Sequence, residues 1–159
     1  MSDIQPNQYA KEEILRIPVA GEDHCAVVSG YATFYQDTAP GDGHPIGCTI
    51  TGGGSNSDPR WFATKVEMIV GPLWRSVADV SPVVNIAGIS FRDSDTTDDT
   101  GYQITDCVWD TVSITDGLIH SKRIRLRVTI TMCGGEQSAV TKLSYHLTAI
   151  GRSLINPIP

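Results

Sequence analysis

The chain has 159 residues, of which 40% are hydrophobic, and its formal net charge is −6 at pH 7. This length supports one domain that can bury a sizeable core. The acidic balance argues against nucleic acid and anionic membrane surfaces as partners, because both would repel the protein.

Residues 1–24 are expected to form an extension before the main domain. They lack a basic start followed by an apolar run, and no stretch of the chain has the length of a membrane span. We therefore expect no membrane insertion, and a protein that is cytoplasmic, a mature form, or released without a leader. Within this extension, residues 8–15 are predicted to form a short helical turn, because they are rich in Ala, Lys and Glu and are followed by Pro18.

Residues 25–151 are expected to form an antiparallel β-sandwich of about six to eight strands, with a C-terminal tail at 152–159. Short β-branched and aromatic runs alternate there with turn-forming Gly, Pro, Asn and Asp, and no helical periodicity is sustained. The predicted strands lie, in chain order, at 25–35, 46–51, 61–70, 83–91, 102–113, 123–132 and 139–150.

Three of these strands carry more detailed predictions. The runs at 123–132 and 139–150 alternate strictly, which predicts an antiparallel hairpin about residues 133–136 with Leu126 and Val128 in the core. The nearly unbroken apolar run at 83–91 predicts a central strand that is buried on both faces.

The sequence offers little support for a metal site or a catalytic site. Its four cysteines are far apart, so buried thiols are expected, with one disulfide left open for a protein that works outside the cell. The histidines lack metal-ligand spacing, and no nucleophile or phosphate-loop motif is present. We expect no enzyme activity and no cofactor. If a metal binds, calcium is favoured, because one loop carries hard oxygen ligands at Asp93, Asp95, Asp98 and Asp99.

The polar loop before residue 61 is the candidate ligand site. Asp58, Arg60 and Trp61 bring a carboxylate, a guanidinium and an indole together, and sugars are bound by such planar polar groups beside an aromatic ring. The alternative is that Trp61 starts a strand and packs inward while Asp58 lies in a turn, and the residues alone favour it. Trp74 and Trp109 are expected in the core or at a sheet edge.

The order of these features resembles the H-type lectin domain of snail agglutinins and discoidins. The matching pieces are the polar loop at 55–60, the strand at 65–70 that continues through Gly-Pro, the Val-Ser-Ile-Thr-Asp-Gly turn at 112–117 and the closing strand at 143–151. The resemblance implies a six-stranded sandwich that forms a homotrimer and binds an N-acetylgalactosamine-type glycan at the protomer boundary.

The resemblance also places site residues, and it shows departures from the family. The family's sugar-contacting Arg falls on Tyr102 or Gln103. Its aromatic-His pair falls on residues 133–136, where Glu136 is the one charged residue. Neither the Arg nor the pair is kept. The predicted ligand-binding residues are therefore Asp58, Arg60, Trp61, Tyr102, Gln103 and Glu136.

Three functional classes stay open on the sequence. The first is a lectin-like protein that binds carbohydrate through surface loops. The second is a structural or receptor-binding sandwich module of a virus or another multi-subunit assembly, which predicts a large apolar interface. The third is a small β-barrel cyclase of a polyketide pathway, because residues 113–120 also resemble a stretch of such enzymes, and it predicts a deep apolar pocket.

Overall fold

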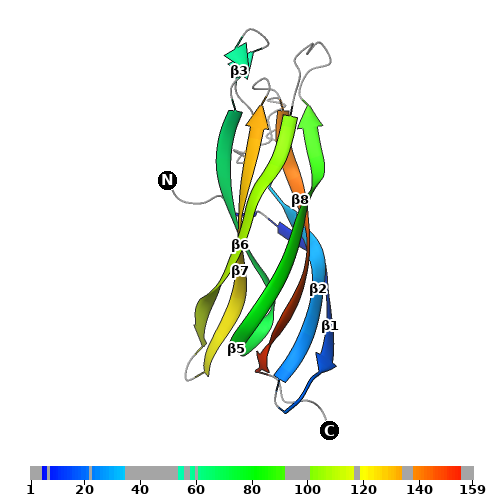
Figure 1. Ribbon diagram of the computed structural model, residues 1–159, viewed down its shortest axis with the longest axis vertical. Coiled ribbons are helices and arrows are strands. Elements are labelled where there is room, and N and C mark those ends of the chain that lie inside the picture. The colour runs from blue at the N-terminus through cyan, green and yellow to red at the C-terminus, as the bar shows by residue number, and fades with distance from the viewer. Residues whose placement is uncertain are drawn as a thin grey trace.

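The computed structural model describes residues 5–6, 8–21, 23–34, 54–55, 58–59, 61–91, 101–116, 119–133 and 138–154. Every regular element in these ranges is a β-strand, which confirms the predicted all-β class (Figure 1). The strands are β1 (Gln8–Pro18), β2 (Asp23–Thr33), β3 (Gly54–Ser55), β4 (Asp58–Pro59), β5 (Trp61–Phe91), β6 (Gly101–Asp116), β7 (Ile119–Cys133) and β8 (Ser138–Ser153). No helix long and apolar enough to cross a membrane occurs among these residues.

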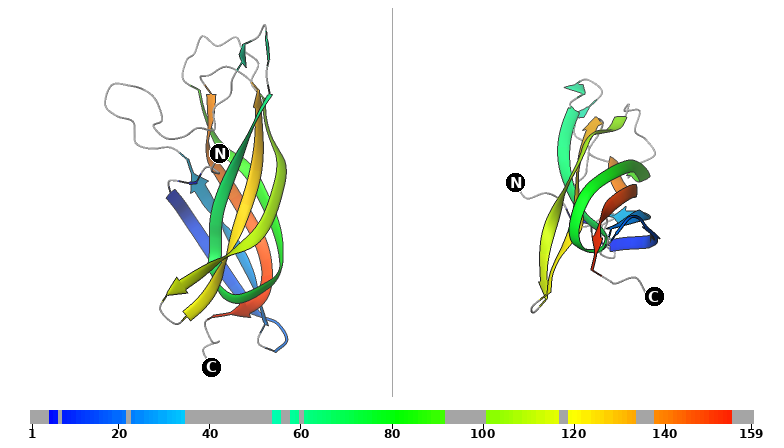
Figure 2. Two further views of the ribbon diagram at one scale, coloured as in Figure 1. Left: turned by 90° about the vertical axis from the view of Figure 1, so that its left-hand side faces the viewer. Right: turned by 60° about the horizontal axis from the view of Figure 1, so that its bottom comes forward.

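Six strands form one antiparallel sheet in the order β1-β2-β8-β5-β7-β6, and the sheet folds into two layers because β5 belongs to both (Figures 1 and 2). Residues 61–70 of β5 pair with β7, whereas residues 76–91 pair with β8. We call β6, β7 and residues 61–70 the three-stranded layer. The four-stranded layer comprises β1, β2, β8 and residues 76–91.

The chain passes from one layer to the other at Gly71, where the ladder of β5 shifts register. Gly71 has a φ of 76°, which favours glycine, and the following Pro72 has no N–H to leave unpaired. The N–H of Gly71 donates to Oε2 of Glu12 at 3.1 Å, and its carbonyl accepts from Nε and Nη2 of Arg123 at 3.1 and 2.9 Å. Side chains thus satisfy the main-chain groups that the corner removes from the ladder.

The core lies between the two layers and is built from alternate residues of their strands. Leu126 and Val128 on β7 are fully buried, which confirms their predicted inward direction. Trp74 is 1% exposed and Trp109 packs against the core, as expected for core aromatics. The other fully buried aliphatic side chains on the long strands are Ala26, Val28, Ala32, Val66, Met68, Val70, Ile124, Ile130, Val140, Leu143, Leu147 and Ala149.

The predicted helical turn at residues 8–15 is wrong. This segment lies in β1, which pairs with β2 from Gln8↔Thr33 to Pro18↔His24. The main-chain hydrogen bonds of the ladder therefore outweigh the helix propensity of a short Ala-, Lys- and Glu-rich run. Part of the segment expected to precede the domain is thus an edge strand of the sheet, and β8 extends two residues beyond the expected boundary at 151.

Two predictions about strand placement are also wrong. β7 and β8 are consecutive, but they do not pair as a hairpin, because β5 lies between them in the sheet. Residues 83–91 do not form a strand buried on both faces, since among the described strands this part of β5 pairs with β8 alone and Val83 is 53% exposed. Alternation reports which face of a strand is buried but not which strand lies beside it.

The remaining predictions fall partly outside the described residues. The strand at 46–51 and the loop at 92–100 lie outside them. β3 and β4 form a pair of two-residue strands within the segment predicted as a loop. The end of the turn expected at 112–117 lies where β6 and β7 form a hairpin, with Asp116 opposite Ile119.

Candidate functional site

A polar groove of about 420 Å³ lies on the four-stranded layer and opens to solvent. Two neighbouring rows of cross-strand partners build most of it. Tyr31 on β2, Ser144 on β8 and Asn85 on β5 form one row, and Ser29 and His146 belong to the next. The polar groove is lined by Lys11, Glu13, Ser29, Gly30, Tyr31, Asn85, Ser144, Tyr145 and His146.

A β-bulge in the edge strand brings two charged side chains to this groove. The ladder between β1 and β2 shifts between Ala10 and Glu13, and Lys11 within the bulge has a φ of 52°. The extra residue allows Lys11 and Glu13 to line the groove while Glu12, between them, turns toward the interior. Bulges of this kind redirect side chains at sheet edges, and left-handed non-glycine residues are often found at functional sites.

The interior side of the same bulge is fixed by Tyr145. Its hydroxyl donates to Oε2 of Glu12 at 2.6 Å, and Nη2 of Arg123 lies 3.8 Å from the other carboxylate oxygen. Gly30 makes room for this contact, because a Cβ there would lie 2.5 Å from the Tyr145 hydroxyl oxygen and 2.8 Å from Cζ. Burial, and then the bond to Glu12, raise the pKa of Tyr145. The bulge beside the groove is therefore held from within.

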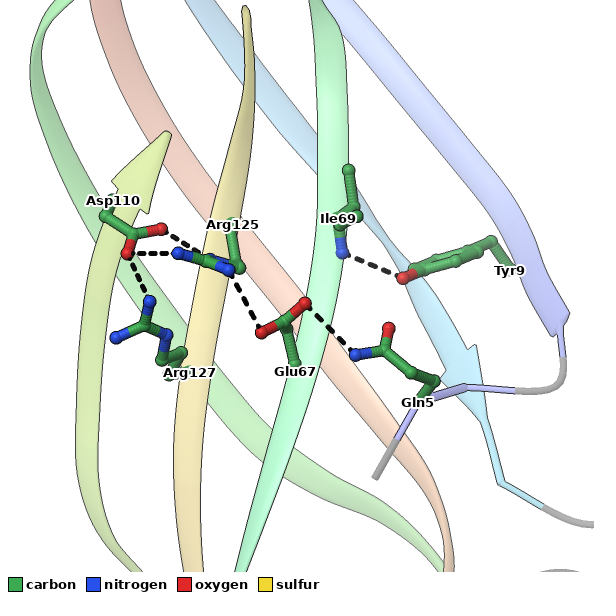
Figure 3. A network of polar contacts seen from close by, with 7 residues as sticks. All are labelled: Gln5, Tyr9, Glu67, Ile69, Asp110, Arg125 and Arg127. Atoms are coloured by element: carbon green, nitrogen blue, oxygen red, sulfur yellow. Dashed lines mark hydrogen bonds and ion pairs between the residues drawn. The ribbon is translucent and has the colours of Figure 1, made fainter. Parts of the chain in front are cut away.

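Tyr9 attaches the start of β1 to the other layer. The N–H of Ile69 donates to the Tyr9 hydroxyl at 2.8 Å, and burial raises the pKa of Tyr9 (Figure 3). Together with the hydrogen bond from Gly71 to Glu12, this contact connects β1, in the four-stranded layer, to β5 near the point where β5 leaves the three-stranded layer. The position of β1, and hence of Lys11 and Glu13, is set by contacts with both layers.

The chemistry of the polar groove suits hydrogen bonding to a polyhydroxylated ligand. Glu13, Asn85 and His146 are exposed, and they offer a carboxylate, an amide and an imidazole. Tyr31 is 37% exposed, and Nζ of Lys142 lies 5.5 Å from its ring centroid, which restrains the ring through a cation–π contact. Planar polar groups beside an aromatic ring are the usual elements of a sugar site.

A second polar network lies on the outer face of the three-stranded layer (Figure 3). Asp110 accepts from Nε and Nη2 of Arg125 at 2.6 and 2.7 Å and from Nη2 of Arg127 at 2.6 Å. Glu67 accepts from Arg125 at 3.3 Å and from Gln5 at 3.1 Å. The hydrogen bond from Arg125 lowers the pKa of Asp110. These side chains are hydrogen-bonded to one another across β6, β7 and β5, so we assign them a structural role. We call Asp110, Arg125, Arg127 and Glu67 the clamp.

The sequence-predicted site residues that the structure places lie at one end of the three-stranded layer. Trp61 and Gly101 are both opposite Cys133, so Tyr102 and Gln103 lie in the next two rows. Tyr102 is half-buried against the core, whereas Gln103 is exposed. The main chain of Asp58 belongs to β4. The other predicted residues lie outside the part of the chain that the structure describes. They are Arg60, Glu136 and the predicted calcium ligands Asp93, Asp95, Asp98 and Asp99, together with the side chains of Asp58 and Trp61.

The cysteines and metal-ligating residues that are described form no additional site. Cys25 and Cys107 are free and half-buried, and burial raises the pKa of the Cys107 thiol. The side chains of Cys48 and Cys133 are not described. No group of three or more His, Cys, Asp and Glu side chains suited to a metal ion is found in the described ranges.

The sequence does not predict the polar groove. Its residues come from four strands, of which β5 and β8 lie far along the chain from β1 and β2, and the strand order was not predicted. One signal was present: Ser29 and Tyr31, like Ser144 and His146, are polar or aromatic residues at the outward positions of strongly alternating strands. Comparisons with protein-family models, with curated proteins and with solved structures gave no match for this chain. The resemblance to H-type lectins therefore stays a prediction from the sequence motifs.

Proposed function

We propose that this protein is a lectin-like carbohydrate-binding protein and that the polar groove is its sugar site. The observation that carries the proposal is the presence of Glu13, Asn85 and His146 beside the exposed ring of Tyr31 in one open groove. The carboxylate and amide can each form paired hydrogen bonds to vicinal hydroxyls, while the ring can contact an apolar C–H face of a sugar.

The charge of the groove favours a neutral or amino sugar over an acidic one. Lys11 and Glu13 come from the same edge strand and offset each other, and the chain as a whole carries a net charge of −6. The resemblance to H-type lectins suggests an N-acetylgalactosamine-type ligand bound by a homotrimer. That family places its site in the loops around Asp58 and Arg60, so the groove and the loops are alternative locations for one proposed activity.

Glycan-array screening followed by isothermal titration calorimetry tests this function. We expect Tyr31→Ala and Asn85→Ala each to weaken binding of the best glycan by about 1–3 kcal/mol, because each removes a direct ligand contact. Chelation of divalent cations is expected to leave the affinity unchanged. If no glycan binds at any tested concentration, the lectin proposal fails.

Matched variants distinguish the two locations. Asp58→Ala and Arg60→Ala should leave the affinity unchanged if the sugar is held by the groove. They should weaken binding by about 1–3 kcal/mol if the loops hold it, as the loss of charge-assisted hydrogen bonds does. Thermal melting of every variant is the control, because an equal loss of stability would indicate that the residue supports the fold.

A structural or assembly module is the second candidate, and one observation favours it. Several large apolar side chains on the outer face of the four-stranded layer are exposed, with Leu15 at 61%, Val83 at 53%, Ile17 at 45% and Ile150 at 39%. Exposed apolar groups gathered on one face are typical of protein interfaces. The cyclase alternative needs a deep apolar chamber, and across the described residues the space between the layers is occupied by the core side chains.

A further inference from the structure

The polar groove is longer than one sugar ring. It crosses the neighbouring strands β1, β2, β8 and β5, from Lys11 and Glu13 at one end to Asn85 at the other. Three spacings between strands, of about 4.7–4.9 Å each, separate these ends and give a length of roughly 14 Å. A hexose ring spans little more than one such spacing. The volume of about 420 Å³ agrees, because it lies in the range of roughly 300–1,000 Å³ for pockets that hold drug-sized ligands, which are larger than one hexose.

The two ends of the polar groove differ in chemistry. Tyr31 and Asn85 belong to a row of neutral side chains across β2, β8 and β5. The end on β1 carries the ammonium of Lys11 and the carboxylate of Glu13, and both side chains are exposed. The ladder with β2 places Ala10 opposite Tyr31, and the bulge adds Lys11 beside it with a φ of 52°. The charged end therefore depends on a departure from the regular ladder, and such departures are often found at functional sites.

We infer that the polar groove has two subsites and binds two adjacent sugar residues of a glycan, which rests on the carbohydrate-binding function proposed for this groove. The first subsite lies at Tyr31 and Asn85. Nζ of Lys142 lies over the Tyr31 ring at 5.5 Å from its centroid, so it takes one face of the ring and leaves the other for a sugar. A single stacking face serves one sugar ring, so hydrogen bonds must hold the second residue.

The second subsite lies at Lys11 and Glu13. A sugar hydroxyl can accept one hydrogen bond and donate another, so a neighbouring ammonium and carboxylate suit the hydroxyls of a neutral sugar. Hydrogen bonds to these two groups are charge-assisted, and they are stronger than those between neutral groups. Because the two charges offset each other, this end of the groove selects for hydroxyl groups and not for a charged sugar.

Isothermal titration calorimetry with probes of two lengths measures the occupancy of the subsites. The probes are methyl glycosides taken from the glycan that binds best on the array: each of its single sugars, with N-acetylgalactosamine included in every case, and each pair of adjacent sugars. We expect the best disaccharide to bind the wild-type chain at least about tenfold more tightly than the best single sugar, because the second residue adds charge-assisted hydrogen bonds.

Lys11→Gly and Glu13→Gln test the second subsite. A φ of 52° favours glycine, so Lys11→Gly removes the ammonium without straining the bulge. Each variant should lower the disaccharide affinity by about five- to tenfold and leave the affinity for the single sugar unchanged. Asp79→Asn is the matched control, because Asp79 is exposed on the same layer but does not line the groove, and it should change neither affinity. Thermal scans verify that every variant folds.

Two results would overturn the second subsite while the proposed function still stands. One is a disaccharide that binds no more tightly than its single sugars. The other is a pair of Lys11→Gly and Glu13→Gln variants that weaken both probes equally or leave the disaccharide affinity unchanged. If no probe binds at all, the proposed function fails, and the second subsite fails with it.

Discussion

The hydroxyl of Tyr145 lies 2.6 Å from a carboxylate oxygen of Glu12, and this hydrogen bond joins the middle of the four-stranded layer to its edge strand. The same oxygen of Glu12 accepts from the N–H of Gly71 at the corner of β5. One carboxylate therefore connects β1, β8 and the passage between the two layers.

Tyr145→Phe tests how much this connection stabilises the fold. The ring stays packed, but Glu12 loses a donor in a largely buried position, so we expect the free energy of unfolding to fall by about 1–3 kcal/mol. Urea unfolding measures the change, and amide exchange should increase in β1. Tyr31→Phe is the control, because that ring lies on the outer face, and it should change stability by less than about 0.5 kcal/mol. Equal effects of the two variants would contradict a special role for the contact.

The raised pKa of Tyr145 predicts a loss of stability in alkaline solution. Because the folded state holds this proton to a higher pH than the unfolded chain does, the folded state binds more protons above the unfolded pKa of about 10. The free energy of unfolding should therefore be unaffected below that pH and fall as the pH rises through it. Tyr9 has the same sign but is 37% exposed, whereas Tyr145 is 2% exposed and should dominate.

Urea unfolding at a series of pH values from 8 to about 11 measures this dependence. Tyr145→Phe should show a shallower decline than the wild-type chain, because the group responsible for most of the linkage has been removed. Parallel curves for the two proteins would show that Tyr145 does not cause the alkaline loss.

Leu126→Asp should abolish cooperative folding. Leu126 is fully buried between the layers, and an unpaired carboxylate there is expected to cost about 3 kcal/mol or more. Val108→Asp is the matched control, because Val108 is 47% exposed on the neighbouring strand β6. Circular dichroism and thermal melting compare the two variants, and a folded Leu126→Asp protein would refute the assigned core.

The clamp formed by Asp110 and Arg125 should contribute modestly and in a salt-dependent manner. Asp110→Asn removes the charge that faces Arg125 and Arg127, and we expect a loss of about 0.5–1 kcal/mol at low ionic strength, since the side chains are partly exposed. Added salt should reduce the difference from the wild-type chain by screening. Asp106→Asn, exposed on the same strand and outside the clamp, should have a smaller effect at every salt concentration.

Much of the fold followed from alternation along the chain. The burial of Leu126 and Val128 is confirmed, because a period-two pattern indicates directly which face of a strand is buried. The helical turn at 8–15 was wrong because helix propensity in a short segment is weaker than a ladder with β2. The supposed hairpin of β7 and β8 was wrong because the long strand β5 inserts between two strands that are adjacent in the chain.

The candidate site depends on features of the fold that the sequence does not predict. Lys11 lines the groove because of a bulge that no local sequence motif predicts. Tyr31, Asn85 and His146 lie together only because β2, β8 and β5 are neighbours in the sheet. Asp58, Arg60 and Trp61 are predicted instead because they lie within four consecutive residues of the chain. Adjacency along the chain identifies sites built on single loops, whereas sites on a sheet depend on register between distant strands.

The single strand shared by both layers has a consequence for how this chain folds. Each layer contains one part of β5, because residues 61–70 pair with β7 and residues 76–91 pair with β8. Neither layer can therefore form all of its strand pairs before β5 is in place on both sides of Gly71. Each of those pairings joins parts of the chain that are dozens of residues apart, which slows folding through the entropy of closing long loops. We therefore expect one slow, all-or-none transition in which no half of the protein is stable when expressed by itself.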